Sequence, residues 1–246
     1  MTAAEKKTVF KLIKLASDYT FGYNDNSISE HDYNFQDDVA VVIKSKENKP
    51  KSSDISMEDI AKKVKACKNC RLSQARTNTV LGEGVAHPVV LVVGEGPGEQ
   101  EDKSGRPFVG PAGQLLDKML AAINLSRTSN CYIGNIVKCR PPKNRTPYPD
   151  EMETCVSYLE AQIHILKPKV ILAMGNTAVK GLIKTEKGIT HLHGTFLQYN
   201  GIPFLPTFHP SALLHNVELK RPAWEDLKIL RSWLETNAPG YDKATS

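Results

Sequence analysis

The sequence predicts an α/β fold in which a central four-stranded parallel sheet is flanked by helices, within a single main domain. Short apolar runs, typical of strands buried on both faces, occur at four places from residue 89 onward. The segments between them are longer and have apolar residues at helical spacing. Because strands alternate with helices, a doubly wound sheet is expected, with its functional loops at the carboxyl ends of the strands.

The four predicted strands are short, apolar or both. Residues 89–93 (Val-Val-Leu-Val-Val) end in a glycine-rich stretch, and residues 169–173 (Lys-Val-Ile-Leu-Ala) lead to Gly-Asn-Thr. A further strand-like segment at residues 132–137 has a Gly-Asn pair in its middle, and residues 203–207 form the last strand. Each of these segments ends in residues that favour a turn or loop.

Helices are predicted by apolar periodicity and by one capping signal. The pattern Ser56-x-x-Asp59 is a capping box that opens a helix running towards Cys67. Further helices are predicted at residues 112–123, 152–166 and 222–235, with a short one after residue 177.

The N-terminal part differs in composition from the rest. Residues 1–56 contain eight Lys and nine Asp or Glu, a net charge of −1. Residues 4–18 could form a short amphipathic helix, whereas residues 22–56 are rich in Asn, Asp, Ser and Lys, which is typical of a flexible or loosely docked extension. We therefore predict an extension of unknown role at residues 1–56 and a functional domain at residues 57–246.

Charge and hydropathy narrow the class of protein. The 246 residues carry a formal net charge of +5, and residues 57–246 contain 24 Lys or Arg against 18 Asp or Glu. This balance permits a polyanionic partner, although a Lys-rich surface also serves solubility. No apolar run approaches the roughly eighteen residues that span a bilayer, and Lys11 and Lys14 interrupt any signal-peptide core. We expect a soluble intracellular protein without a membrane partner.

Five cysteines are present, and two of them are closely spaced. Their odd number argues against a disulfide framework. Cys67-x-x-Cys70 can direct both sulfurs to one metal centre, and Cys139 and Cys155 are available as further ligands. Cys131 lies in an apolar stretch and is expected to be a small buried residue. Spacing alone leaves an iron–sulfur cluster, a zinc ion or a redox pair open, and it favours metal binding.

Glycine-rich or polar loops follow the four predicted strands. Each is a weak signal by itself, because the first lacks the third glycine of a dinucleotide fingerprint and any Walker lysine, and the His-Pro pair of the last equally suits a turn. Taken together, in this order and after a Cys-x-x-Cys motif, the four loops are a highly specific signal. The loops are Gly94-Glu-Gly-Pro-Gly-Glu-Gln-Glu-Asp102 with Gly105-Arg-Pro-Phe-Val-Gly110, Gly134-Asn135 leading to Cys139-Arg-Pro-Pro-Lys-Asn-Arg-Thr-Pro147, Gly175-Asn-Thr-Ala178, and His209-Pro-Ser-Ala-Leu-Leu214.

The complete set closely resembles the family 4 uracil-DNA glycosylases, over residues 61–234 and not over residues 1–56. The resemblance implies their fold and a structural 4Fe–4S cluster, held by the cysteines that match Cys67, Cys70, Cys139 and Cys155. It also implies a monofunctional enzyme that flips uracil out of DNA and hydrolyses its N-glycosidic bond. The product is an abasic site, the first step of base excision repair. A cytoplasmic, nucleoid-associated monomer acting on uracil-containing DNA is expected.

The resemblance further implies a base-binding pocket. Phe108 matches the aromatic residue that stacks on uracil, although core packing would also suit it. Asn135 can donate to uracil O4 and accept from N3–H, a pattern that cytosine reverses; a turn cap is the alternative. Glu101 is expected to stand beside C5 and exclude thymine. Gly96, also in the pocket, stands where better-known uracil glycosylases have an aspartate.

Catalysis is expected to be mainly electrostatic. His209 matches the family histidine that donates to uracil O2 and stabilises the departing anion as a neutral imidazole. Glu95, at a strand end, could orient the attacking water or stabilise the sugar cation. No lysine stands out as a Schiff-base nucleophile.

Four residues are expected to contact DNA. Ser211, Asn176 and Thr177 lie at turns and helix starts that suit phosphate binding, although each also suits a helix cap. Leu213 is expected to insert into the gap that the flipped base leaves.

Three other functions account for parts of the pattern. Covalent uracil-capturing relatives use a histidine in an inserted basic loop, but residues 143–147 contain neither the histidine nor the insertion. A non-catalytic iron–sulfur DNA-binding module would lack the pocket set, yet Phe108, Asn135 and His209 are all present. A small-ligand enzyme with a phosphate loop would leave four cysteines without a role.

Overall fold

The structure is a computed structural model that describes residues 55–243. The helix predicted at residues 4–18 and the extension up to residue 54 lie outside the described residues. None of the helices between residues 55 and 243 is both long and apolar enough to cross a membrane.

The centre of the fold is a six-stranded sheet with the order β1-β3-β2-β4-β6-β5. The inner four strands are parallel, as predicted, whereas β1 and β5 pair antiparallel at the two edges and were not predicted. The strands are β1 (Glu83–Gly84), β2 (Val90–Gly94), β3 (Cys131–Asn135), β4 (Val170–Met174), β5 (Leu197–Tyr199) and β6 (Ile202–Thr207). Edge strands of two or three residues contain no apolar run, so the sequence pattern does not predict them.

The register of the inner strands brings their carboxyl ends together. Gly94, the last residue of β2, lies opposite Asn135, the last residue of β3. Met174 at the end of β4 lies opposite Thr207 at the end of β6, and β4 pairs with β2. All four loops that the sequence singles out therefore start at one edge of the sheet, as expected for a parallel sheet.

Helices follow the predicted pattern, with short ones added in the loops. The structure contains α2 (Met57–Ala66), α3 (Glu99–Ser104), α4 (Pro111–Ala121), α5 (Pro149–Leu166), α6 (Gly175–Ile183), α7 (Ile189–Leu192), α8 (Pro210–His215) and α9 (Lys220–Asn237). Short 3₁₀ helices are η2 (Arg71–Gln74), η3 (Pro142–Asn144) and η4 (Val217–Leu219). The predicted capping box is present, since the Asp59 amide donates to Ser56 Oγ and the Ser56 amide donates to Asp59.

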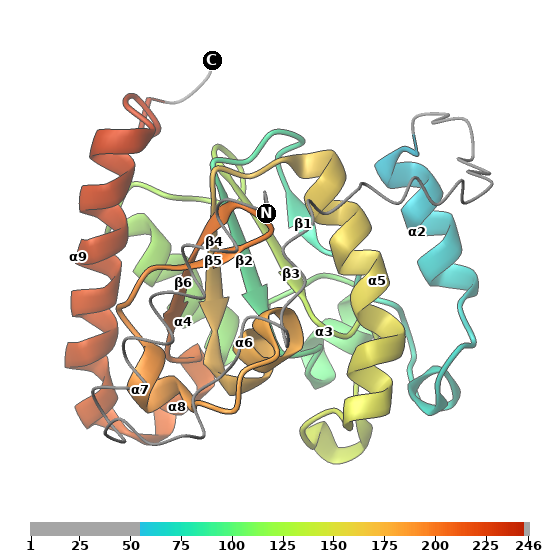
Figure 1. Cartoon of the computed structure of the whole chain (residues 1–246). Helices are drawn as coiled ribbons and strands as arrows, with labels where there is room; N and C mark the ends of the chain where they lie inside the picture. Colours follow the sequence, from blue (N-terminus) through green and yellow to red (C-terminus); the bar gives the residue numbers. More distant parts are fainter. Residues whose placement is uncertain (1–54, 244–246) are drawn as a thin grey trace, which may run out of the picture. The chain divides into compact units, whose positions relative to one another are not determined.

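Helices cover both faces of the sheet (Figure 1). On one face, apolar side chains of β2 and β4 pack with α5, α6 and α7 in a buried cluster. On the other face, the alternate side chains of the same strands pack with α4 and α9. All five residues of each of β2, β3 and β4 are buried, which is why β2 and β4 appear in the sequence as continuous apolar runs; β3 ends in a buried Gly-Asn pair. The rigid sheet presents its carboxyl edge to solvent.

Candidate active site

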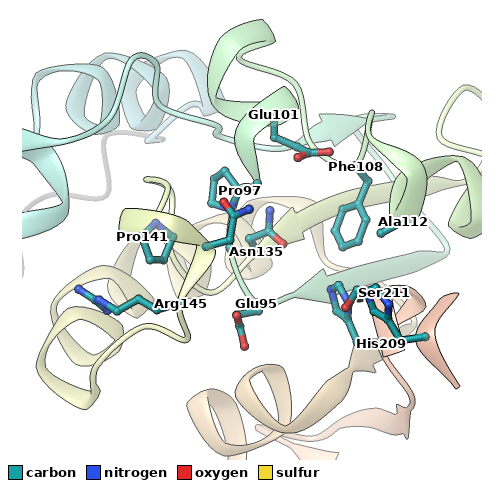
Figure 2. A pocket seen from close by; sticks show the side chains of 14 residues that line it. Glu95, Pro97, Glu101, Phe108, Ala112, Asn135, Pro141, Arg145, His209 and Ser211 are labelled. Atoms are coloured by element: carbon teal, nitrogen blue, oxygen red, sulfur yellow. Dashed lines mark hydrogen bonds between the residues drawn. The ribbon is translucent and has the colours of Figure 1, made fainter. Parts of the chain in front are cut away.

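A pocket of about 430 Å³ opens at the carboxyl edge of the sheet. It brings together residues from three of the four predicted loops, among them Asn135, the last residue of β3. Figure 2 shows the side chains of Asn135, Phe108 and His209 around one space, with Glu95 at its lower side. The predicted residues that line it are Glu95, Gly96, Glu101, Phe108, Asn135, His209 and Ser211.

Asn135 forms the buried wall of the pocket. Only 1% of the residue is exposed, and its Oδ1 atom accepts no hydrogen bond from any described residue. A Cβ atom on Gly94 would stand 2.6 Å from this Oδ1 and 2.5 Å from Cζ of Phe108, so glycine is required beside them. A buried acceptor without a donor is costly. The pocket therefore offers an acceptor to a ligand that carries an N–H or O–H group.

Phe108 projects from a strained backbone. Its φ angle is +52°, in the left-handed region that aromatic residues rarely adopt, and 6% of the residue is exposed. The ring centroid lies 5.7 Å from that of His209, with the planes tilted by 35°. Non-glycine residues in this region cost about 1–3 kcal/mol and are found at functional sites. The side chain is therefore held at the pocket by its surroundings rather than by local preference.

Two charged side chains hold the three peptide groups around Phe108. Arg127 donates to the carbonyl of Pro107 at 2.8 Å and to that of Phe108 at 3.0 Å. Glu101 Oε1 accepts from the amides of Val109 and Gly110, both at 2.8 Å. Glu101 thus lines the pocket, as predicted, and its observed contacts fix the loop that carries the aromatic ring.

Arg127 was not predicted from the sequence. It follows α4, outside every motif, and its guanidinium is anchored by Asp117 at 2.8 Å. Its side chain is 10% exposed. A lone arginine in a connection carries no sequence signal, because its partners are backbone carbonyls that the fold brings to it.

His209 lies at the N-cap of α8 with a defined tautomer. Its Nδ1 accepts from the Ser211 amide at 3.2 Å, and the Ser211 hydroxyl lies 2.7 Å from the same atom. A backbone amide can only donate, so Nδ1 is unprotonated and the proton is on Nε2. Burial lowers the pKa of His209 to about 4. The ring is therefore neutral at pH 7 and presents Nε2–H as a donor.

Glu95 lies between two cavities. A second pocket of about 340 Å³ adjoins the first, and Glu95 and His209 line both. The hydroxyl of Thr177, on α6, donates to Glu95 Oε2. Gly96 also lines both pockets, and a Cβ there would stand 2.6 Å from Cγ2 of Val137. An aspartate at position 96 would therefore require a buried valine to move.

The polar side chains predicted to contact DNA have protein partners. Asn176 Oδ1 accepts from the Ile189 amide at 2.7 Å, so it caps α7. The Thr177 hydroxyl forms a hydrogen bond with the Glu95 carboxylate, and the Ser211 hydroxyl forms one with Nδ1 of His209. Asn176 thus has the capping role that the sequence left as an alternative, whereas the contacts of Thr177 and Ser211 to other pocket side chains were not predicted.

Leu213 does not have the exposure that insertion into DNA requires. It is 2% exposed and belongs to the apolar cluster on the α5–α6 face of the sheet. The next residue on α8, Leu214, is 44% exposed. The predicted wedge at Leu213 is therefore corrected, because the helix turns that side chain into the core.

Four of the five cysteines surround one small cavity, and the fifth lies elsewhere. Cys67 and Cys70 reach it from the segment after α2, Cys139 from the loop after β3, and Cys155 from α5. Cys131 is fully buried in the opposite apolar cluster, where burial raises its pKa to about 12. The cysteines that the sequence groups as ligands are thus brought together, and Cys131 is a buried core residue, as expected.

Two nitrogen donors, neither of them predicted, face the sulfurs. Arg76 Nη1 lies 3.0 Å from Cys139 Sγ, and the Lys138 amide lies 3.3 Å from Cys155 Sγ. The Lys138 side chain is also buried, at 1% exposure, and its Nζ donates to the carbonyl of Asn135 at 2.8 Å. One residue therefore connects the cysteine cavity to the wall of the pocket.

Comparison with known proteins agrees with this geometry. Residues 81–228 match the family model of the uracil DNA glycosylase superfamily. The chain is 46% identical over 183 residues to the type-4 uracil-DNA glycosylase of Thermotoga maritima, covering 73% of this chain and 95% of that protein. It is 42% identical over 184 residues to the type-4 enzyme of Sulfurisphaera tokodaii, covering 72% of this chain and 84% of that protein. These matches show that the chain belongs to the uracil-DNA glycosylase superfamily and, within it, to the type-4 uracil-DNA glycosylases.

Proposed function

We propose that this chain flips deoxyuridine out of DNA into the pocket at the sheet edge and hydrolyses its N-glycosidic bond. The products are free uracil and an abasic site, as in the first step of base excision repair. The observation that carries the proposal is the buried, unpaired Oδ1 of Asn135 beside Phe108. Such an atom is satisfied by a donor on a planar ligand, and the N3–H group of uracil is that donor.

Discrimination against cytosine follows from the same atom. The unprotonated N3 of cytosine is an acceptor, so it would face the lone pairs of Asn135 Oδ1 across a buried contact. Leaving buried polar groups unpaired costs about 1–3 kcal/mol each. Stacking of the base on Phe108 adds affinity without distinguishing the pyrimidines. Specificity therefore resides in Asn135 and affinity in Phe108.

His209 is proposed to stabilise the leaving group. As the glycosidic bond breaks, negative charge develops on uracil O2 and positive charge on the sugar. A neutral Nε2–H donor aimed at O2 stabilises that anion without giving up its proton. The orientation of this Nε2–H group is set by the two contacts of Ser211 to Nδ1, at 3.2 and 2.7 Å.

Glu95 is proposed to act at the sugar. Because Glu95 and His209 line both pockets, a nucleotide with its base in the first pocket and its sugar-phosphate in the second would place the scissile bond beside them. A carboxylate there stabilises the sugar cation and can orient water towards C1′. No lysine among residues 55–243 lines either pocket, so strand cleavage through a Schiff base is not expected.

The four-cysteine cavity is proposed to hold a 4Fe–4S cluster through Cys67, Cys70, Cys139 and Cys155. Thiolates are the ligands of such clusters, and hydrogen bonds from nitrogen donors to the sulfurs, such as those of Arg76 and the Lys138 amide, stabilise their charge. A zinc ion would bring its ligands within about 2.3 Å of one point. Among residues 55–243, no three Cys, His, Asp or Glu side chains are arranged to hold one metal ion. The proposal of a cluster rather than zinc rests on the resemblance of these four cysteines to the ligands of the family.

The cluster's proposed contribution is structural. It would join the segment after α2 and helix α5 to the loop that follows β3, and Pro141 and Arg145 of that loop line the base pocket. Arg145 is also held to the buried Glu151 of α5 by contacts of 2.7 and 2.8 Å. The chemistry at the glycosidic bond passes through none of these groups.

The test is incubation with an oligonucleotide that contains one uracil, followed by a denaturing gel with and without hot alkali. Cleavage that depends on alkali is expected, whereas matched oligonucleotides with thymine or cytosine should stay intact. A denaturant-stable adduct in place of cleavage would indicate covalent capture. An unchanged oligonucleotide without an adduct would contradict catalysis on this base.

A further inference from the structure

We propose that Thr177 is a positioning residue that orients the Glu95 carboxylate towards the sugar of the flipped nucleotide. This role extends the proposed function of Glu95 and rests on it. The positioning role differs from the phosphate contact that the place of Thr177 at the start of a helix suggests.

The two side chains meet because of the sheet topology. Glu95 directly follows β2, and Thr177 lies in the first turn of α6, which begins where β4 ends. Strands β2 and β4 are neighbours in the sheet, so the residues just beyond their ends lie side by side. The Thr177 hydroxyl donates to Glu95 Oε2, and the residue is only 7% exposed. The contact is thus built into the rigid part of the fold.

The hydroxyl has one proton to donate, and the carboxylate uses it. A phosphate oxygen can only accept, so Thr177 cannot donate to DNA while it donates to Glu95. Thr177 lines the second pocket but not the first, so it restrains Glu95 from the side of the sugar-phosphate. With Oε2 held in this way, Oε1 is the oxygen that remains for water or the sugar cation.

Orientation of this kind affects the chemical step more than binding. A glutamate without a partner samples several rotamers, and catalysis requires one of them. Loss of the hydroxyl should therefore lower the rate of bond cleavage and leave DNA affinity unchanged. Valine has nearly the shape of threonine without the donor, and serine keeps the donor.

The experiment compares T177V, T177S and E95Q with the double variant T177V/E95Q in single-turnover excision and in DNA binding. T177V is expected to lower the single-turnover rate at least tenfold with less than a twofold change in Kd, and T177S should retain most of the rate. The double variant should match E95Q alone, because a residue that acts through Glu95 has no further effect once the carboxylate is gone. Thr190→Val, an exposed threonine on α7, is the matched control and should behave as wild type.

Three outcomes would overturn the proposal, and they are distinguishable. A wild-type rate for T177V, with E95Q impaired, would refute the role of Thr177 and leave that of Glu95 intact. A raised Kd for T177V, with additive losses in the double variant, would indicate a DNA contact instead. A wild-type rate for E95Q would refute the proposed role of Glu95 and this inference with it. Melting temperature and iron content, measured for each variant, identify any loss that comes from unfolding.

Discussion

At the scale of single residues, the pocket combines two neutral groups with complementary roles. Asn135 offers a buried acceptor, and His209 offers a donor whose direction is set by Ser211. Neither group needs to change its protonation state during the reaction. This arrangement suits electrostatic catalysis, in which preoriented dipoles face the charge that develops on the leaving base.

Replacing Asn135 by aspartate should reduce uracil excision by roughly 10- to 100-fold, because the donor to uracil O4 becomes a buried oxygen that repels it. Single-turnover rates on uracil and cytosine oligonucleotides measure the change in discrimination. Asn144→Asp is the control, since Asn144 lines the same pocket but is exposed. Equal effects of the two substitutions would remove Asn135 from base recognition.

The lowered pKa of His209 predicts that the stability of the fold depends on pH. Burial lowers its pKa to about 4 in the folded chain, below its ordinary value near 6.5. Between these values the unfolded chain binds the proton and the folded chain does not, so the free energy of unfolding should fall as the pH is lowered from about 6.5 to about 4. Urea denaturation at pH 7 and pH 5 should show a smaller loss for His209→Ala than for the wild type. A parallel loss in both proteins would contradict a neutral buried imidazole.

At the scale of elements, the conformation of the loop around Phe108 depends on side chains from other parts of the chain. The turn that carries Phe108 is held by Arg127 from the connection after α4 and by Glu101 from α3. Both charged groups bind backbone atoms rather than each other. These two residues therefore hold the backbone that positions the Phe108 ring.

Replacing Arg127 by methionine should lower kcat/KM for uracil oligonucleotides about tenfold, because the loop around Phe108 can relax from the left-handed conformation, which costs roughly 1–2 kcal/mol. Steady-state kinetics measure the loss. Arg106→Met is the matched control: Arg106 lies in the same loop, but it is exposed and paired with Glu83. A wild-type kcat/KM for Arg127→Met would show that the loop keeps its conformation unaided.

Helix α8 carries two adjacent leucines with opposite environments. Leu213→Ala should lower the free energy of unfolding by about 2–5 kcal/mol, the usual range for a buried leucine. Leu214→Ala should leave stability within about 0.5 kcal/mol, as exposed substitutions do. Thermal denaturation of the two variants decides this. A large loss of stability at Leu214 only would reverse the assignment of the two side chains.

At the scale of the whole described domain, the cysteine cavity and the base pocket are joined through one segment. Asn135, Lys138 and Cys139 follow one another between the strand end and the cavity. Lys138 Nζ donates a hydrogen bond to the Asn135 carbonyl, and the backbone amide of Lys138 faces Cys155 Sγ. Loss of the proposed cluster should therefore disturb the pocket as well as the fold.

If the proposed cluster is present, replacing Cys155 by serine should reduce bound iron and lower the melting temperature, because one of its four proposed thiolate ligands is lost. Cys131→Ala is the matched control, since Cys131 is also buried but lies on the other side of the sheet. It should retain the iron of the wild type. Iron analysis and the visible absorption spectrum provide the measurement, and unaltered iron in the Cys155 variant would refute the ligand assignment.

Most of the fold was predictable, because strands buried on both faces must be apolar along their length. The inner strands β2, β3, β4 and β6 were predicted from short, largely apolar segments, and the long helices from apolar residues at helical spacing; both are confirmed. The edge strands β1 and β5 were missed, since two or three partly exposed residues carry no such pattern. The resemblance to a glycosylase family is confirmed by the comparisons, because its motifs are short contiguous runs that the sequence displays directly.

The amino-acid sequence by itself determined the class of fold, the family and the residue types of the pocket, because each depends on local pattern or contiguous motif. The tertiary structure decided the partner of each polar side chain. It assigned Thr177 to Glu95, Asn176 to the start of α7 and Arg127 to the Phe108 loop. These pairs are 82, 13 and 19 residues apart in the chain. Hydrogen bonds across such separations leave no periodicity in the sequence, since only the packed sheet brings their donors and acceptors together.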